Sequence, residues 1–391
     1  MKRLRGYKTE LWVKPAQIEM FKKHVGVARY IYNWALATRK AAYESDEKKS
    51  LGTFELNKLL TQLKQQPDTT WLYETSITTQ QEAIRNLCKA YDNFFRRVKL
   101  GTEAPGFPKF HSRFSAKQSF CLRGNFAVTP NQIKLPKIGW VKLKESNYIP
   151  TTGARYLLAT ISTSGGRWYI SMQVEEDVPE PVQPTGLAIG VHMGINPLVT
   201  CSNALRYEAA KPLKKHLKKL ARLEREKSRR QKDSSNRAKT VKKIGRLHDH
   251  IANIRAHNLH QISHDISYSD HSTIVVDGYD VREMKQGTIS NINRAFSDVA
   301  MGELRRQITY KGEWNSSAII KADKTFASAH ICSVCGYTID TKIQIGERFL
   351  CPKCRIDISA KLNAALNLRK LAGKPPESIN ACGEDGSNSP Q

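Results

Sequence analysis

The stretch Cys332-Ser-Val-Cys335, followed after fifteen residues by Cys351-Pro-Lys-Cys354, decides how the second half of this chain is organised. Two Cys-x-x-Cys pairs at this separation are typical of a zinc ribbon, because four thiolates so spaced can surround one Zn²⁺ tetrahedrally. Four sulfur ligands leave no coordination position for water, so we expect a structural zinc. Four unliganded thiols or two disulfides are the alternatives. Directly beyond the second pair the sequence reads Lys361-Leu-Asn363-Ala-Ala365.

The composition indicates a multidomain protein with a polyanionic partner. The chain has 391 residues, is 40% hydrophobic, and carries a formal charge of +27 from 63 basic and 36 acidic residues. The length suits two or three domains with buried cores, and the charge suits nucleic acid. A merely soluble basic protein is disfavoured because the charge is clustered. Eight cysteines, oddly spaced, fit a reducing cytoplasm better than a disulfide scaffold. We expect no membrane segment, since no run of about 18 apolar residues occurs.

The first half of the chain changes from helical to strand patterns. A strand from Tyr7 to Val13 precedes Pro15, which opens a helix. A second helix is expected over about 80–97. Residues 119–176 predict short strands, including a hairpin around Gly165-Gly166.

A long basic segment is the strongest nucleic-acid signal. Residues 211–246 hold 16 Lys or Arg against three acids, and an amphipathic helix is expected over about 247–268. A solvated helix face would hold more acids at i,i+4 spacing, so we predict that this segment contacts phosphates. The best candidates are Lys214, Lys215, Lys218, Lys219, Arg222, Arg229 and Arg230.

Four further motifs, in order, resemble those of one family. They are Gly106-Phe-Pro-Lys-Phe110, Gly190-Val-His192-Met-Gly194, Ile274-Val-Val-Asp277 and Asn363-Ala-Ala365. With the cysteine pairs, they resemble the TnpB family of transposon-encoded RNA-guided DNA nucleases, which are related to type V CRISPR effectors. The resemblance covers nearly the whole chain.

The resemblance implies a mixed fold, α/β and β, in several domains. A wedge β-barrel domain would comprise residues 1–14 and 119–183, with a helical recognition module inserted at 15–118. A RuvC-like domain of the RNase H type would comprise 184–328 and 356–373, with the zinc ribbon inserted at 329–355. Residues 374–391, rich in Pro, Ser and Gly, are expected to form a disordered tail.

The family's catalytic positions are substituted in this chain. Nucleases of this type hold two magnesium ions with three carboxylates, an Asp, a Glu and the Asp before Asn-Ala-Ala. His192, Asp277 and Lys361 stand at these positions. We therefore expect no catalytic magnesium and no enzyme. The expected class is a nuclease-dead TnpB-like repressor (TldR), which binds a guide RNA and a matching DNA site and represses transcription without cleavage.

Alternatives to loss of cleavage remain open at this point. An active RNA-guided endonuclease of a transposon is the main one, and Asp357, four residues before Lys361, is a candidate replacement ligand. A Lys361–Asp277 salt bridge filling the metal site is a further hypothesis. A guide-free transposon-end or RNA-binding protein is the other functional class.

The resemblance also implies partners. A guide RNA would pair with the target strand, while the protein recognises a short adjacent motif in duplex DNA. Gln80, Gln81 and Arg85 are candidates for contacts with base edges, and Lys109, Arg113 and Lys117 for RNA phosphates. We expect a monomer on its RNA, in a prokaryotic cytoplasm and associated with the nucleoid. The histidines of 248–264 are expected to face solvent or RNA.

Overall fold

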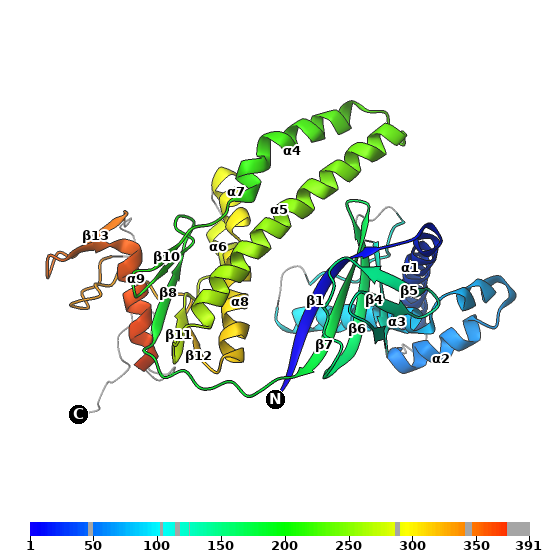
Figure 1. The fold of residues 1–391 in the computed structure, drawn as a ribbon, viewed down its shortest axis with the longest axis horizontal. Coiled ribbons are helices and arrows are strands. Elements are labelled where there is room, and N and C mark those ends of the chain that lie inside the picture. Colours follow the sequence, from blue (N-terminus) through cyan, green and yellow to red (C-terminus); the bar gives the residue numbers. More distant parts are fainter. Residues whose placement is uncertain are drawn as a thin grey trace. The chain divides into compact units, whose positions relative to one another are not determined.

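The chain forms two compact units, Met1–Pro179 and Glu180–Gln391. The computed structural model describes residues 1–45, 50–101, 105–113, 118–124, 126–285, 290–340 and 346–373. Lys117 and the predicted tail at 374–391 lie outside these ranges. Figure 1 shows the helices and strands of the two units.

A seven-stranded antiparallel sheet forms the centre of the first unit, in the order β2-β6-β7-β1-β5-β4-β3. β1 pairs with β7 from Lys2↔Asp177 to Leu11↔Trp168. The strands are β1 (Lys2–Trp12), β2 (Gln118–Arg123), β3 (Ala127–Val128), β4 (Gln132–Leu135), β5 (Gly139–Leu143), β6 (Ala154–Ser164) and β7 (Arg167–Asp177).

The predicted β-barrel is not found. β2 and β3 are the two edges of the sheet, and within the described residues they do not pair with each other. β3 comprises only Ala127–Val128, which offers too few backbone groups to close the sheet against the six residues of β2. The sheet therefore stays open and buries one face under a helix.

Helix α1 (Pro15–Glu44) belongs to two cores at once. Phe21 and Val25 pack on the sheet, whereas Ile31 and Leu36 pack against the other helices. These helices are α2 (Thr53–Leu63), the 3-10 helix η1 (Pro67–Glu74) and α3 (Ile77–Lys99). α3 begins earlier than predicted, after Ser76.

The second unit contains a five-stranded mixed sheet in the order β10-β9-β8-β11-β12. β8 pairs antiparallel with β9 and parallel with β11, and β11 pairs parallel with β12. The strands are β8 (Ile189–Met193), β9 (Val199–Cys201), β10 (Arg206–Tyr207), β11 (Thr273–Val276) and β12 (Ala318–Lys321). α6 (Val281–Lys285) and α7 (Ser290–Val299) follow β11.

The two faces of this sheet are covered by different helices. Ile274 and Val276 pack with Leu259 of α5 (Ser235–Ser267) and Ile308 of α8 (Met301–Trp314). Val275, which points to the opposite face because side chains alternate along a strand, packs with Leu368 of α9 (Ala360–Lys370). η2 (Leu371–Gly373) follows α9.

Gly190 in β8 allows α9 to lie directly against the sheet. A Cβ atom at this position would lie 2.0 Å from Ala365 O and 2.5 Å from Arg369 N. Any larger residue would therefore displace the helix backbone. Ala364 and Ala365, both fully buried, complete this close approach.

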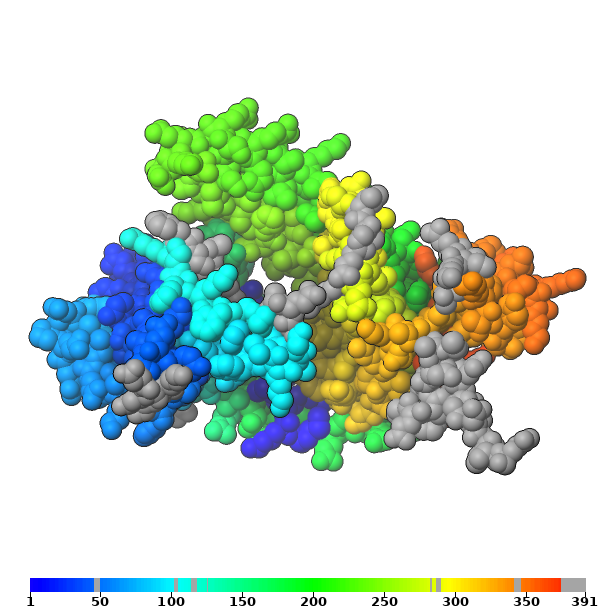
Figure 2. All heavy atoms as spheres, turned by 180° about the vertical axis from the view of Figure 1, so that it is seen from behind, coloured from blue at the N-terminus to red at the C-terminus, as the bar shows by residue number. Residues whose placement is uncertain are grey.

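Helices α4 (Pro212–Arg229) and α5 form a helical hairpin, visible as the green arm of Figures 1 and 2. It has its own small core of Leu223, Ile244, Leu247 and Ile251. Ser234 caps α5, its Oγ accepting a hydrogen bond from Arg237 N at 3.2 Å. The prediction of a helix starting near 247 is therefore wrong, because α5 begins at Ser235. Among the residues that the structure describes, no helix is both long and apolar enough to cross a membrane.

Candidate metal centre and nucleic-acid surfaces

The four predicted cysteines lie together. Their Sγ atoms are all within 4.8 Å of one another. Cys332 Sγ lies 3.6 Å from Cys354 Sγ, and Cys335 Sγ lies 3.5 Å from Cys351 Sγ. Tetrahedral zinc with Zn–S bonds of about 2.3 Å needs sulfur atoms about 3.8 Å apart. The cluster therefore fits one zinc ion with four sulfur ligands.

Each cysteine pair is folded in the same way by the backbone. Gly336 N donates to Cys332 O at 3.0 Å, and Arg355 N donates to Cys351 O at 2.9 Å. Both residues that close these turns have left-handed backbone, with φ of 75° and 59°. Burial raises the pKa of Cys351, but the N–H groups of Cys354 and Lys353 and the neighbouring thiols lower it by more. The N–H of Ile356 lowers the pKa of Cys354, but burial and the other three cysteines raise it by more. The four sulfur atoms thus stabilise one thiolate among them.

A short hairpin supports the second pair. β13 (Arg348–Leu350) pairs antiparallel with β14 (Asp357–Ser359). Phe349 is buried between the cysteines and Ile358. An apolar core of this size cannot stabilise the module alone, so the folding of the ribbon depends on a bound metal or on packing against neighbouring elements.

Two asparagines join the cysteine module to α9. Asn363 Oδ1 accepts a hydrogen bond from Ser333 N at 2.8 Å, and its Nδ2 donates to Ile331 O at 2.7 Å. Asn367 Nδ2 donates to Ile331 O and to Ser328 O, at 2.6 and 2.9 Å. Both asparagines are buried. The Asn of the Asn-Ala-Ala motif therefore fixes the first cysteine pair onto the helix.

The positions of His192 and Asp277 come together at the carboxyl ends of the parallel strands β8 and β11. His192 Nδ1 lies 3.0 Å from Asp277 Oδ2, although the ring is not oriented for a hydrogen bond between them. The same carboxylate oxygen accepts a hydrogen bond from Met193 N at 2.7 Å. Asp277 is 3% exposed, so its charge is stabilised by these neighbours rather than by water.

Two residues that sequence reasoning missed lie beside Asp277. The hydroxyl of Tyr279 donates to Met193 O, and burial, together with the nearby Asp277 charge, raises the pKa of Tyr279 well above its usual value. Arg305 Nη1 donates to Asp277 O at 3.1 Å and to Tyr279 O at 2.8 Å. Only their proximity to Asp277 in the fold reveals them.

Lys361 turns away from Asp277. Its Nζ donates to Asn196 O in the loop after β8, and the described residues contain no ion pair between Lys361 and Asp277. The hypothetical salt bridge is therefore not formed. Asp357 is no replacement either. It lies in β14 and accepts a hydrogen bond from Arg348 Nε at 2.7 Å, which is the main cause of its lowered pKa.

The residues at these three positions do not fit a two-magnesium site. Magnesium needs oxygen ligands in octahedral geometry, and His192 and Lys361 supply nitrogen and a positive charge. Among the described residues, the one group of three or more His, Cys, Asp or Glu side chains close enough to share a metal is the cysteine cluster. No catalytic step through magnesium follows from this arrangement.

The helical hairpin presents an exposed basic surface. Lys214, Lys215, Lys218, Lys219, Arg222 and Arg229 of α4 are exposed, and none of them forms an ion pair within the described residues. Arg230 differs, since it pairs with Glu226 at 2.5 Å. Asp298 fixes the start of α4 by accepting hydrogen bonds from Leu213 N and Lys214 N, both at 3.0 Å.

The candidates in the first unit have different surroundings. Gln80 is fully buried, and its Nε2 donates to Leu72 O at 2.7 Å, so it is out of reach of a base. Gln81 is half-buried, and Arg85 pairs with Glu82. Glu82 also accepts from Arg123 Nε at 2.7 Å. Lys109 and Arg113 are exposed, whereas Lys117 lies outside the described residues.

Comparison with known proteins gives the class of this chain. Residues 169–288 match a family model described as "Probable transposase", 1–49 a "Helix-turn-helix domain" and 302–368 a "Cas12f1-like, TNB domain". A relative from Escherichia coli K12, "Putative RNA-guided DNA endonuclease InsQ", is 32% identical, covering 98% of this chain and 95% of the relative. A "Putative RNA-guided DNA endonuclease" of Streptomyces pristinaespiralis is 29% identical, over 93% and 88%.

The chain therefore belongs to the TnpB (IS605 OrfB) family of RNA-guided DNA endonucleases. This membership corrects the prediction that the chain is not an enzyme, because its curated relatives are named as endonucleases. Among solved structures, a Cas12f1–sgRNA–target DNA complex covers 94% of this chain and 99% of its own, at 17% identity and a TM-score of 0.34. A likeness of that size has no bearing on function.

Proposed function

We propose that this chain binds a guide RNA and is directed by it to a matching DNA site next to a short duplex motif. The observation that supports the proposal most strongly is the 32% identity, over nearly the whole of both chains, to a protein named as an RNA-guided DNA endonuclease. Base pairing by the guide would supply sequence choice, and the protein would supply backbone contacts.

The exposed basic face of α4 suits the contacts that such a complex needs. Six exposed basic residues form no ion pair with the acids that the structure describes, and this, together with a net charge of +27, favours binding to phosphates. Contacts of this kind position a nucleic acid without selecting a sequence. We expect one protein chain on each RNA, in the compartment that holds the DNA.

The finer proposal is that occupancy of the matched site represses transcription. In this proposal, the hairpin contacts the nucleic acid and the guide RNA pairs with the DNA. Neither contact uses His192 in β8, Asp277 after β11 or Lys361 in α9. A protein held on a promoter by an RNA–DNA heteroduplex would block polymerase by excluding it. RNA-guided cleavage is the second candidate function, and the names of the relatives favour it.

One experiment tests these proposals together. The protein is purified with its own RNA, the RNA is sequenced, and the matching DNA is placed across a reporter promoter. Native gels measure RNA-dependent binding, and denaturing gels with magnesium measure whether the DNA stays intact. Repression with intact DNA supports occupancy, whereas loss of the reporter through cut DNA supports cleavage. A protein that binds scrambled DNA equally well would overturn guidance by RNA.

We also propose that the cysteine cluster holds one structural zinc ion. Its four sulfur atoms have the spacing that tetrahedral zinc needs. When bound, the ion would supply folding free energy to a module whose own apolar core is small. Its expected role is to hold the ribbon on α9 through Asn363.

A further inference from the structure

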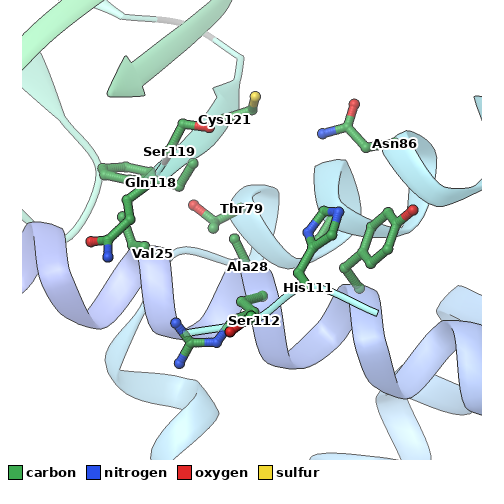
Figure 3. Close-up of a pocket in the computed structure, with 13 residues that line it drawn as sticks. Val25, Ala28, Thr79, Asn86, His111, Ser112, Gln118, Ser119 and Cys121 are labelled. Atoms are coloured by element: carbon green, nitrogen blue, oxygen red, sulfur yellow. The ribbon is translucent and has the colours of Figure 1, made fainter. Parts of the chain in front are cut away.

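A cavity of about 460 Å³ lies in the first unit between α1, α3 and β2 (Figure 3). Its volume falls within the usual range for small-molecule sites, about 300–1,000 Å³. Polar groups from separate elements line it, including Arg29, Thr79, Asn86 and His111. A cavity of this volume is too small for a double helix but can take a single flat group.

Thr79 leaves an unsatisfied hydroxyl at this cavity. The residue is 1% exposed, and its Oγ1 is buried without a hydrogen-bond partner in the described part of the chain. Leaving a buried polar atom unpaired costs free energy, and such atoms are rare in native proteins. A ligand atom that bonds this hydroxyl would remove that cost.

An aromatic pair forms one wall of the cavity. The rings of Tyr32 and His111 stack at 4.0 Å with an interplanar angle of 8°. Asn33 fixes the backbone of His111 on both sides, since its Oδ1 accepts from His111 N at 2.8 Å and its Nδ2 donates to His111 O at 3.0 Å. His111 is exposed and lines the cavity, and Tyr32 stacks on one face of its ring, so a further ring would stack on the opposite face.

Arg29 adds a positive charge to the lining, and within the described residues it has no ion-pair partner. A ring to stack on, a buried hydroxyl and a guanidinium match two parts of a nucleotide, its base and its phosphate. Its base would stack, its polar edge would bond Thr79 and its phosphate would face Arg29. An apolar ligand would leave both Thr79 and Arg29 unpaired.

We propose that this cavity accepts one unpaired nucleotide, its base stacked on His111 and hydrogen-bonded to Thr79, with its phosphate beside Arg29. The inference rests on the proposed function, in which the chain holds RNA and opened DNA. The nucleotide comes either from the bound RNA or from a DNA strand released from its duplex. The chemistry of recognition is the same in both cases.

The test is ultraviolet crosslinking of the complex purified with its own RNA, before and after addition of the matching DNA. We expect a nucleotide on the peptide that contains Tyr32 or His111. A ribonucleotide adduct formed without DNA identifies the RNA as the source. A deoxyribonucleotide adduct formed only after DNA is added identifies the DNA. A complex that retains RNA and binds its target but shows no adduct here overturns this inference alone.

Matched variants test the contacts. Thr79→Val should weaken binding of the source nucleic acid by about 2- to 10-fold, the range for one hydrogen bond. It should not lower the melting temperature, because the hydroxyl has no partner among the residues that the structure describes. His111→Ala should abolish the adduct. Thr61→Val, at an exposed position in α2, is the control and should change neither. If Thr79→Val lowers the melting temperature but leaves nucleic-acid affinity unchanged, the hydroxyl stabilises the fold and does not bind a nucleotide. A native protein that retains no RNA contradicts the proposed function instead.

Discussion

Asn363 in α9 accepts a hydrogen bond from the backbone N–H of Ser333, between the first two cysteines, at 2.8 Å. The cysteine module and the helix that packs on the five-stranded sheet are thus one structural unit. Asn363→Ala would leave Ser333 N buried without a partner, while Ile331 O would keep its bond from Asn367. We expect a loss of about 1–3 kcal/mol in unfolding free energy, measured by urea denaturation. The exposed Asn253→Ala in α5 is the control, and equal losses in both would contradict this role.

Removing one cysteine should remove the metal. Native protein should contain about one zinc per chain by atomic absorption, and Cys351→Ser should contain much less and melt at a lower temperature. Cys121→Ser in β2, outside the cluster, should keep its zinc. Native protein that stays folded and metal-free in the presence of added zinc would refute the assignment.

The basic face of α4 should set the salt dependence of RNA binding. Replacing Lys214, Lys218 and Arg222 with Gln should reduce the magnitude of the slope of log K against log salt by about 2 to 3. The reason is that fewer counterions are released on binding when fewer phosphates are contacted. The control removes the same charge at Lys23, Lys144 and Lys324, which already pair with acids. Equal slopes for the two variants would count against the surface.

Restoring carboxylates should strengthen metal-dependent cutting. His192→Asp, Asp277→Glu and Lys361→Asp together supply three acids where one now stands, which is the donor set that two magnesium ions need. We expect faster magnesium-dependent cleavage of matched DNA than with the native chain, measured on denaturing gels. Lys58→Asp with Gln62→Asp, at exposed positions in α2, adds the same negative charge and is the control. A triple variant no faster than this control would mean that the three positions do not share a metal.

Acid should destabilise the first unit through His24. This histidine is buried in α1, its Nε2 accepts a hydrogen bond from Ser76 N at 3.1 Å, and burial lowers its pKa from the usual 6.5. The unfolded chain therefore binds a proton at a higher pH than the folded chain does. The stability that neutral His24 provides is complete above about pH 6.5 and is lost as the pH falls toward its lower folded pKa.

Between about pH 7.5 and pH 5, the melting temperature of His24→Gln should fall less than that of the native protein. His264→Gln, at an exposed position in α5, should leave the pH dependence unchanged. If the native and His24→Gln proteins lose stability in parallel, the acid effect has another origin.

The sequence predicts local features of this chain better than the contacts between distant ones. The cysteine cluster and the Gly165-Gly166 turn are set by residues close together in the sequence. The structure contains both, the cysteines as one cluster and the glycines between β6 and β7. Gln80 was misplaced because its partner, Leu72 O, belongs to a preceding 3-10 helix that helical periodicity does not reveal. The turn between α4 and α5 was missed because Leu223 and Ile244 meet only once the chain has folded back.

The same limit applies to the candidate sites. The pattern of motifs placed His192 at the end of one strand and Asp277 at the end of another, and the parallel pairing of β8 with β11 brings them within 3.0 Å. Tyr279 and Arg305 lie beside Asp277 without any motif of their own. The nucleotide-sized cavity combines α1, α3 and β2, and no linear pattern joins these three elements.

The close approach of α9 to Gly190 has a consequence for biosynthesis. β8 leaves the ribosome long before α9 is translated, and until then Gly190 and Val275 lack the helix that packs on them. During elongation, the second unit is therefore incomplete and exposes apolar surface. A ribosome stalled before residue 360 should expose a nascent chain that recruits chaperones, and release of α9 should end that vulnerability.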